Sequence, residues 1–221
     1  MKDLDEKGTF KYNQRKREIS PLYTCFPNSI CSAWEIVNQK EDCWNNVLNY
    51  HTEFKSVADK FTYFLRFEPM MQEVYKFYFP TEYKKWKNDK TKDKWLYSDK
   101  SYPPNEIFKV ICIGFNLFLN MNCGDNYSEK CYIKNLTMSD MKEEINKGKP
   151  IVTSFKLGSI QGHLMTIKGY DDYSFIVYDT YGCPYLEKFK NKGNAKIISF
   201  SDFKKLCKPL KEDEKMCVCF D

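Results

Sequence analysis

The order of helical and strand patterns along the 221-residue chain predicts an α+β fold. Helical patterns dominate residues 25–147, whereas residues 148–221 carry short segments rich in β-branched and aromatic residues. Helices followed by strands that a tight turn connects are typical of helices packed beside an antiparallel sheet. The chain shows no internal repeat and no linker, so we expect one domain, 1–221, with a helical lobe over about 25–147 and a sheet lobe over about 148–221.

The first helix is predicted from the apolar spacing that follows Pro27. Its apolar residues recur at i, i+3, i+4 and i+7: Ile30, Ala33, Trp34 and Val37. Proline suits the first helical turn, where its missing N–H costs no hydrogen bond. Cys25 is therefore expected at, or just before, a helix N-terminus.

Three further helical segments are predicted before the sheet, over residues 44–78, 105–120 and 141–146. Ser139 and Asp140 are the candidate caps of the last one, which should end at Gly148. Residues 1–24 are polar and irregular, and residues 82–100 are polar and lysine-rich.

The strands are expected over residues 151–155, 163–169, 174–178, 196–200 and 216–220. The second and third flank the turn 170–173 and predict a hairpin. His163 opens the first hairpin strand and Asp179 follows the second, so the two side chains should be neighbours at one end of the hairpin.

Composition excludes several classes of protein. Hydrophobic residues make up 42% and aromatic residues 17% of the chain, which excludes a disordered or collagen-like protein. No stretch approaches the ~20 apolar residues of a membrane span. The net charge of +5 and the pI near 8.5 lie below the range of dedicated nucleic-acid binders, so no nucleic-acid partner is expected.

One segment leaves a nucleic-acid surface open as an alternative. Trp86 and Trp95 stand among lysines within residues 82–100, and cations beside aromatic rings suit single strands. Asp89, Asp93 and Asp99 interrupt this run, which favours a solvated helix or loop.

The ten cysteines lack the C-x-x-C spacing of common zinc and thioredoxin sites. Cys217 and Cys219 should share one face of the last strand, where a metal site with Cys183 and Cys207 is conceivable. The simpler interpretation is unpaired thiols in a reducing compartment, with no metal and no cofactor. Residues 1–8 have no apolar core, so we expect no signal peptide, which favours a cytoplasmic location or an already processed chain.

Histidine is scarce, and this narrows the possible chemistry. His51 and His163 are the two histidines of the chain, and His51 is interpreted as a surface helix residue without a role. A thiol at a helix N-terminus is favoured as thiolate, and an imidazole beside it lowers the thiol pKa further. Cys25 lies 138 residues before His163, close to the ~130–150 that separate nucleophile and base in papain-like enzymes.

These motifs resemble the papain-like peptidases of the bacteriocin-leader-processing type and their stand-alone bacterial relatives. The first matching motifs are Gln14-Arg15, Pro21, Thr24-Cys25 and Asn28-Ser29. The later ones are Gly148-Lys149-Pro150, Gly162-His163, Gly169-Tyr170-Asp171 and Asp179-Thr180-Tyr181-Gly182. The resemblance covers about residues 12–38 and 147–205 and implies a papain-like fold.

The resemblance also implies a role for four residues. Cys25 would be the nucleophile, His163 the general base and acid, Asp179 the residue that orients the imidazole, and Gln14 an oxyanion donor. The substrate would be a peptide or protein, cleaved through a thioester, and the same machinery can transfer the acyl group to an amine.

The chain departs from the family pattern at Phe26, Asn28 and Thr180. A bulky Phe26 could narrow the cleft. Phe26 and Thr180 therefore leave a second hypothesis open, a catalytically silent binding module with the same fold. The sequence does not predict the oligomeric state.

Overall fold

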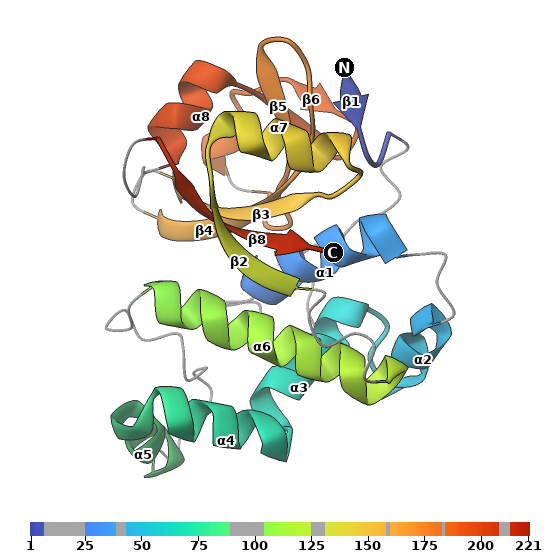
Figure 1. The fold of residues 1–221 in the computed structure, drawn as a ribbon, viewed down its shortest axis with the longest axis vertical. Coiled ribbons are helices and arrows are strands. Elements are labelled where there is room, and N and C mark those ends of the chain that lie inside the picture. Colours follow the sequence, from blue (N-terminus) through green and yellow to red (C-terminus); the bar gives the residue numbers. More distant parts are fainter. Residues whose placement is uncertain are drawn as a thin grey trace.

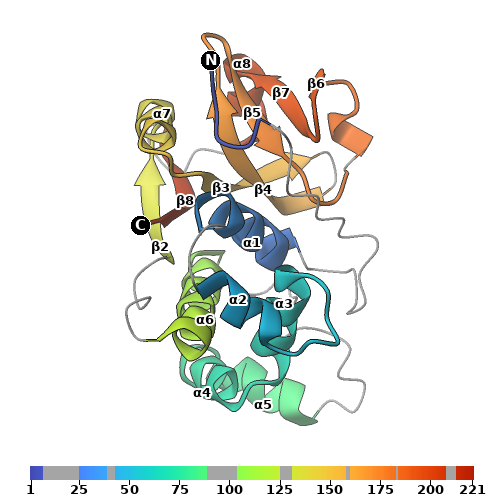
Figure 2. The same ribbon diagram turned by 90° about the vertical axis from the view of Figure 1, so that its right-hand side faces the viewer.

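Eight helices and an eight-stranded sheet form the described part of the chain, arranged in two lobes with α1 between them (Figures 1 and 2). The computed structural model describes residues 1–6, 25–38, 43–88, 104–124, 131–157, 160–182, 184–207 and 213–221. The helices are α1 (Cys25–Asn38), α2 (Cys43–Asn49), α3 (Val57–Phe67), α4 (Pro69–Tyr78), α5 (Pro80–Asn88), α6 (Pro104–Cys123), α7 (Met138–Asn146) and α8 (Phe200–Leu206). The strands are β1 (Lys2–Asp3), β2 (Cys131–Leu136), β3 (Ile151–Leu157), β4 (Ile160–Tyr170), β5 (Ser174–Tyr178), β6 (Asn191–Lys192), β7 (Ala195–Ser199) and β8 (Lys215–Phe220). The predicted α+β fold class is confirmed.

The sheet is antiparallel throughout the described residues, in the order β2-β8-β3-β4-β5-β7-β6, and β1 pairs with the end of β4. The predicted hairpin is β4 and β5, with Thr166 opposite Tyr178. Strand β2 was not predicted, and it pairs with β8 along its whole length. Residues 131–146, which the sequence assigned to the helical lobe, therefore build β2 and α7 on the sheet side (Figure 2).

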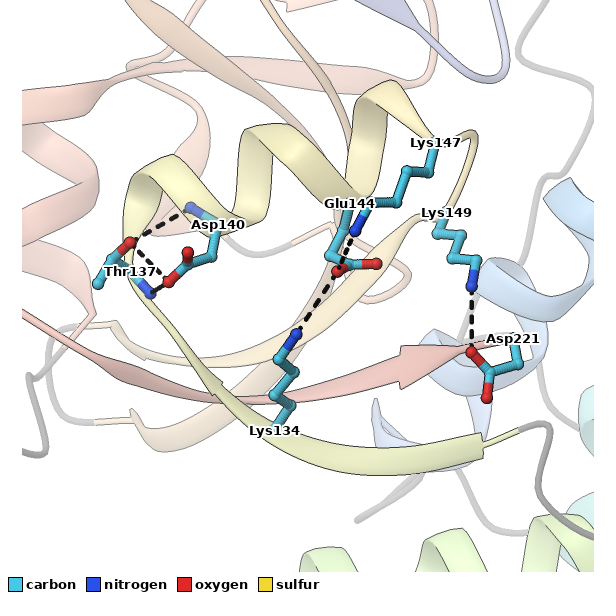
Figure 3. Close-up of polar contacts among 7 residues, drawn as sticks. All are labelled: Lys134, Thr137, Asp140, Glu144, Lys147, Lys149 and Asp221. Carbon is cyan, nitrogen blue, oxygen red and sulfur yellow. Dashed lines mark hydrogen bonds and ion pairs between the residues drawn. The ribbon is translucent and has the colours of Figure 1, made fainter.

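Helix α7 begins at Met138, and its cap is Thr137, two residues before Ser139, the first of the predicted caps. The Thr137 hydroxyl accepts from the Asp140 N–H, and the Asp140 carboxylate accepts from the Thr137 N–H at 2.8 Å, which makes a capping box (Figure 3). Ser139 lies inside the helix and does not cap it. At the other end of α7, the carboxylate of Glu144, which is almost fully buried, lies 3.1 Å from the Lys147 ammonium and 3.7 Å from the Lys134 ammonium, so its charge is compensated.

The predicted helical segment 44–78 is three helices. Residues between α2 and α3 turn at His51, which has φ of +44°, so His51 is a turn residue and its interpretation as a helix residue is wrong. Ser56 caps α3 by accepting from the Asp59 N–H at 3.0 Å. Pro69 begins α4, because a residue before proline avoids the helical region and a proline fits the first turn.

Helix α6 contacts α2, α3 and α4 of the helical lobe and also β2 of the sheet, and it lies on the side of the helical lobe that faces the sheet (Figure 1). Its residues Glu106–Cys123 are long and apolar enough for a membrane span by length and composition, which the sequence analysis did not anticipate. Val110, Phe115 and Phe118 of this helix are fully buried in the protein, as expected of a core helix, which meets the same criteria. Phe115 contacts Trp34 of α1 edge-on, so α6 supports the helix that carries Cys25.

The N-terminal residues form strand β1, which the polar pattern of residues 1–24 did not predict. Lys168 of β4 is 2% exposed, donates to the backbone oxygen of Asp5 at 2.6 Å and lies 3.3 Å from the Asp3 carboxylate. Gly169 is needed beside this strand, because a Cβ there would come within 2.3 Å of the Lys2 oxygen. Residues 1–6 are thus fixed to the sheet by charge and by close backbone contact.

The described cysteines include both unpaired thiols and one disulfide-bonded residue. Cys217 and Cys219 lie on the same face of β8, as predicted, and both are buried in one apolar cluster. Cys123 is disulfide-bonded, contrary to the interpretation that the cysteines are unpaired. Cys183 lies outside the described residues.

Candidate active site

The N-terminus of α1 is held against β4, and this contact sets the position of Cys25. Ser29, one turn after Cys25, donates its hydroxyl to the Leu164 oxygen at 2.9 Å. Thr166 in turn donates its hydroxyl to the Ser29 oxygen at 3.0 Å. Both bonds are buried and join residues more than 130 positions apart, so they fix the first turn of α1 beside the strand that begins near His163.

His163 and Asp179 lie together at one end of the β4–β5 hairpin. The Nε2 of His163 is 2.7 Å from the Oδ1 of Asp179, and the two side chains are 6% and 5% exposed. With Nε2 bonded to the carboxylate, Nδ1 is the ring nitrogen that remains for another partner. Tyr181 completes this arrangement, because its N–H donates to the same carboxylate oxygen at 2.9 Å and its ring meets the imidazole edge-on at 5.9 Å.

Cys25 is a hydrogen-bond partner of His163. Burial is the largest influence on the thiol and favours its neutral form. The hydrogen bond and positive charge of His163, together with hydrogen bonds from the backbone at Leu164 and Phe26, outweigh burial and lower the pKa of Cys25 below its ordinary value. The site therefore favours a thiolate where burial alone would oppose one.

The same contacts change the pKa of the His163 imidazole. Burial is again the largest influence and disfavours the charged ring, but hydrogen bonds to Asp179 and Cys25 raise the pKa of His163 to about 10. A lowered thiol pKa beside a raised imidazole pKa favours a thiolate–imidazolium pair over the neutral pair. Such a pair can attack an electrophilic carbon through sulfur and deliver a proton from the ring.

The departures from the family pattern do not obstruct this end of the fold. Phe26 is 4% exposed and packs edge-on against Phe108, with ring centroids 4.6 Å apart. The expectation that Phe26 could narrow a cleft is therefore wrong, because successive helix residues differ by about 100° in direction and Phe26 points into the core. Asn28 and Thr180 are also buried.

Four residues were proposed for the site, and the structure describes three of them. Cys25, His163 and Asp179 lie together, whereas Gln14 lies outside the described residues. The other histidine, His51, is bonded through Nδ1 to Glu53 at 2.8 Å. Sequence reasoning missed Ser29, Thr166 and Tyr181 as supports. Ser29 and Tyr181 do carry a signal, since each lies in a motif shared with the family, Asn28-Ser29 and Asp179-Thr180-Tyr181-Gly182.

Among the described residues, no group of three or more histidines, cysteines or carboxylates is arranged to hold a metal ion. Cys217 and Cys219 do not form such a group with Cys207, although all three are buried in one cluster.

Comparison with known proteins adds one finding. No curated protein and no solved structure matches the chain significantly. The sequence profile of the Peptidase_C39 like family matches residues 11–205, a range that includes Cys25, His163 and Asp179. Since this match spans most of the 221 residues, the chain belongs to the Peptidase_C39 like family of papain-like cysteine peptidases.

Proposed function

We propose that the protein is a cysteine peptidase that hydrolyses peptide bonds through a thioester, with Cys25 as nucleophile, His163 as general acid and base, and Asp179 as the residue that orients the ring. The observation that carries the proposal is the continuous chain of contacts from Cys25 to His163 to Asp179, with a 2.7 Å bond at its second link. The family to which the chain belongs supports the same chemistry.

The reaction follows from the charges at the site. The Cys25 thiolate attacks the carbonyl carbon, and the protonated His163 ring delivers its proton to the leaving amine, which leaves a thioester on sulfur. Water then attacks the thioester while the now neutral ring accepts its proton, and the free thiolate returns. Asp179 holds the ring in one tautomer throughout and stabilises the imidazolium.

The tetrahedral intermediates carry an oxyanion that needs donors. The N–H of Cys25, at the start of α1, has no acceptor within its own helix, because the first N–H groups of any helix lack an intrahelical partner. It is the first proposed donor, and the side-chain N–H of Gln14 is the second. A Gln14→Ala variant should lower kcat far more than it changes KM, whereas an equal loss through KM alone would remove Gln14 from this role.

The test of the proposal is selective alkylation of Cys25 followed by turnover. At pH 6, iodoacetamide should label Cys25 at least tenfold faster than a free model thiol, as read by mass spectrometry of the digested protein. The Cys25→Ala variant should lose both this label and all peptide cleavage. Cys31→Ala is the matched control, because Cys31 lies on the same helix with 0% exposure, and it should keep both.

The result also decides between this proposal and a silent binding module. If Cys25 reacts at pH 6 no faster than the model thiol, its pKa is not lowered and the binding module is the better reading. Fast labelling without hydrolysis of any peptide in a mixed library, but with a new amide formed between a peptide's acyl part and an added amine, would identify an acyl transferase with the same nucleophile.

A further inference from the structure

A second pair of thiols lies where α6 of the helical lobe meets β2 of the sheet. The Asn116 side chain makes two hydrogen bonds to the backbone of Cys131. The Asn116 Nδ2 donates to the Cys131 oxygen at 2.8 Å, and the Cys131 N–H donates to the Asn116 Oδ1 at 2.9 Å. Cys112 precedes Asn116 by one helical turn and therefore shares its face of α6. This places the Cys112 thiol against Cys131, and the two side chains hydrogen-bond within one apolar cluster.

A cavity of about 330 Å³ opens beside this pair and is lined by Asn116, Cys131, Tyr132 and Asp221. The cavity could hold several molecules of water, each of which occupies about 30 Å³ in the liquid. Cys131 and Cys112 are only 2% and 4% exposed as residues, so a large reagent or a protein disulfide could not reach their thiols. A molecule of the size of hydrogen peroxide could approach Cys131 from the cavity.

We propose that Cys112 and Cys131 are an oxidation site, at which hydrogen peroxide entering this cavity forms a disulfide that links α6 to β2. The Cys131 sulfur attacks one peroxide oxygen, the O–O bond breaks, and sulfenic acid and one water result. The Cys112 sulfur then attacks the sulfenic sulfur, the S–O bond breaks, and the second water leaves with the remaining thiol proton. Two thiols lose two electrons in total, and one peroxide becomes two waters.

The surroundings of the pair should make it slow to react. Burial is the largest influence, and with the neighbouring Cys112 thiol it raises the pKa of Cys131 well above its ordinary value. Little thiolate is therefore present at neutral pH, and the thiolate is the reactive form. Cys123 on the same helix is disulfide-bonded, so α6 already carries one oxidised cysteine.

The new bond would tie helix α6 of one lobe to a strand of the other (Figures 1 and 2). It would close a loop of about 20 residues, which in a domain of this size corresponds to a rise of roughly 6–12 °C in Tm. Cys25, the cysteine of the candidate active site, is not part of this pair, so the inference does not depend on the proposed peptidase activity.

The experiment uses the Cys25→Ser protein, so that the acidic active-site thiol does not consume the peroxide. The protein is treated with hydrogen peroxide, denatured, alkylated and digested, and the peptides are identified by mass spectrometry. We expect a cross-linked peptide that joins Cys112 to Cys131, a loss of two alkylatable thiols, and a Tm rise in the range given above. Oxidation of Met121, which is 42% exposed and lies on the same helix, shows that the peroxide dose was sufficient.

Two further variants make the result decisive. In Cys25→Ser/Cys112→Ala the cross-link and the Tm rise should disappear, whereas Cys25→Ser/Cys217→Ala, which removes a buried thiol on another face, should keep both. The proposal is overturned if Met121 is oxidised while Cys112 and Cys131 stay alkylatable, if the cross-link joins other cysteines, or if it forms without a change in Tm. The cross-linked peptide is sought in the Cys25→Ser protein itself, which carries no substitution in the core. The proposal can therefore still be tested if the Cys112→Ala variant fails to fold.

Discussion

The two hydrogen bonds between α1 and β4 should matter more for reactivity than for folding. Ser29 Oγ donates to the Leu164 oxygen and Thr166 Oγ1 donates to the Ser29 oxygen, at 2.9 and 3.0 Å. Leu164 adjoins His163, and Ser29 lies one turn from Cys25. We therefore predict that Ser29→Ala separates the thiol from the imidazole and reduces kcat/KM by one to two orders of magnitude, since a displacement of about 1 Å can cost ~100-fold.

The cost to stability is smaller and can be bounded. A buried hydrogen bond contributes about 0.5–1.5 kcal/mol, and a buried oxygen left without its donor costs about 1–3 kcal/mol. Ser29→Ala should thus lower the free energy of unfolding by about 1–3 kcal/mol, which leaves a domain of ordinary stability folded. Thr166→Val keeps the branched shape and removes one donor, and its cost should be about 0.5–1.5 kcal/mol.

The matched control lies on the same helix. Ser32 is buried to the same degree as Ser29, but its hydroxyl donates to the Asn28 oxygen at 2.7 Å, within α1 itself. Ser32→Ala should cost no more than about 0.5–1.5 kcal/mol in urea denaturation, because the Asn28 oxygen keeps its helical N–H partner, and it should keep both kcat/KM and the fast alkylation of Cys25 at pH 6. Equal activity and equal alkylation of the Ser29 and Ser32 variants would refute the claim that the α1–β4 bonds position the thiol.

Three other outcomes follow from the charges and contacts at the site and at the N-terminal strand. Activity should decline at high pH, near the pKa of about 10 of His163. Asp179→Asn should move this decline to lower pH, because the Asp179 carboxylate is among the groups that raise the pKa of His163. An alkaline limb of the pH–rate profile that does not move would contradict this. His163→Ala should leave burial as the dominant influence on Cys25 and so raise the pKa of its thiol. The midpoint of the plot of alkylation rate against pH should then move to higher pH. A midpoint that stays in place would assign the acidity of Cys25 to the helix N-terminus alone. Gly169→Ala should lower the free energy of unfolding by about 1–3 kcal/mol in thermal or urea unfolding, because the new Cβ meets the Lys2 oxygen. In a chain that lacks residues 1–6, this loss of stability should largely vanish.

The sequence predicted those elements whose pattern is local. Pro27 and the apolar stripe after it were sufficient to place the N-terminus of α1 at Cys25, where the structure has it. The hairpin of β4 and β5 was likewise readable from its turn. Strand β2 was missed because Lys134 and Asn135 interrupt its apolar pattern; its status as a strand depends on pairing with β8, more than 80 residues later.

The residues of the candidate site also fall into some that the sequence could predict and some that it could not. The residue types Cys25, His163 and Asp179, with their spacing, could be selected from the sequence, because few other residues of the chain can do the chemistry. The contact between Ser29 and Thr166 could not be predicted, since a serine and a threonine are common and only tertiary packing brings them together. Phe26 was misjudged for a related reason: its identity suggested obstruction, whereas its direction on the helix decides the matter.

Burial alone does not distinguish Cys25 from the other cysteines of the chain. Cys25 is partly buried and Cys131 is buried, and in both cases burial is the largest influence on the thiol and favours its neutral form. Their pKa values nevertheless move in opposite directions, because the partner of Cys131 is another thiol, Cys112, whereas the partner of Cys25 is an imidazole that Asp179 keeps protonated. The acidity of Cys25 is therefore a property of the contact between α1 and the β4–β5 hairpin, and any change that separates these elements should make Cys25 as inert as a core cysteine.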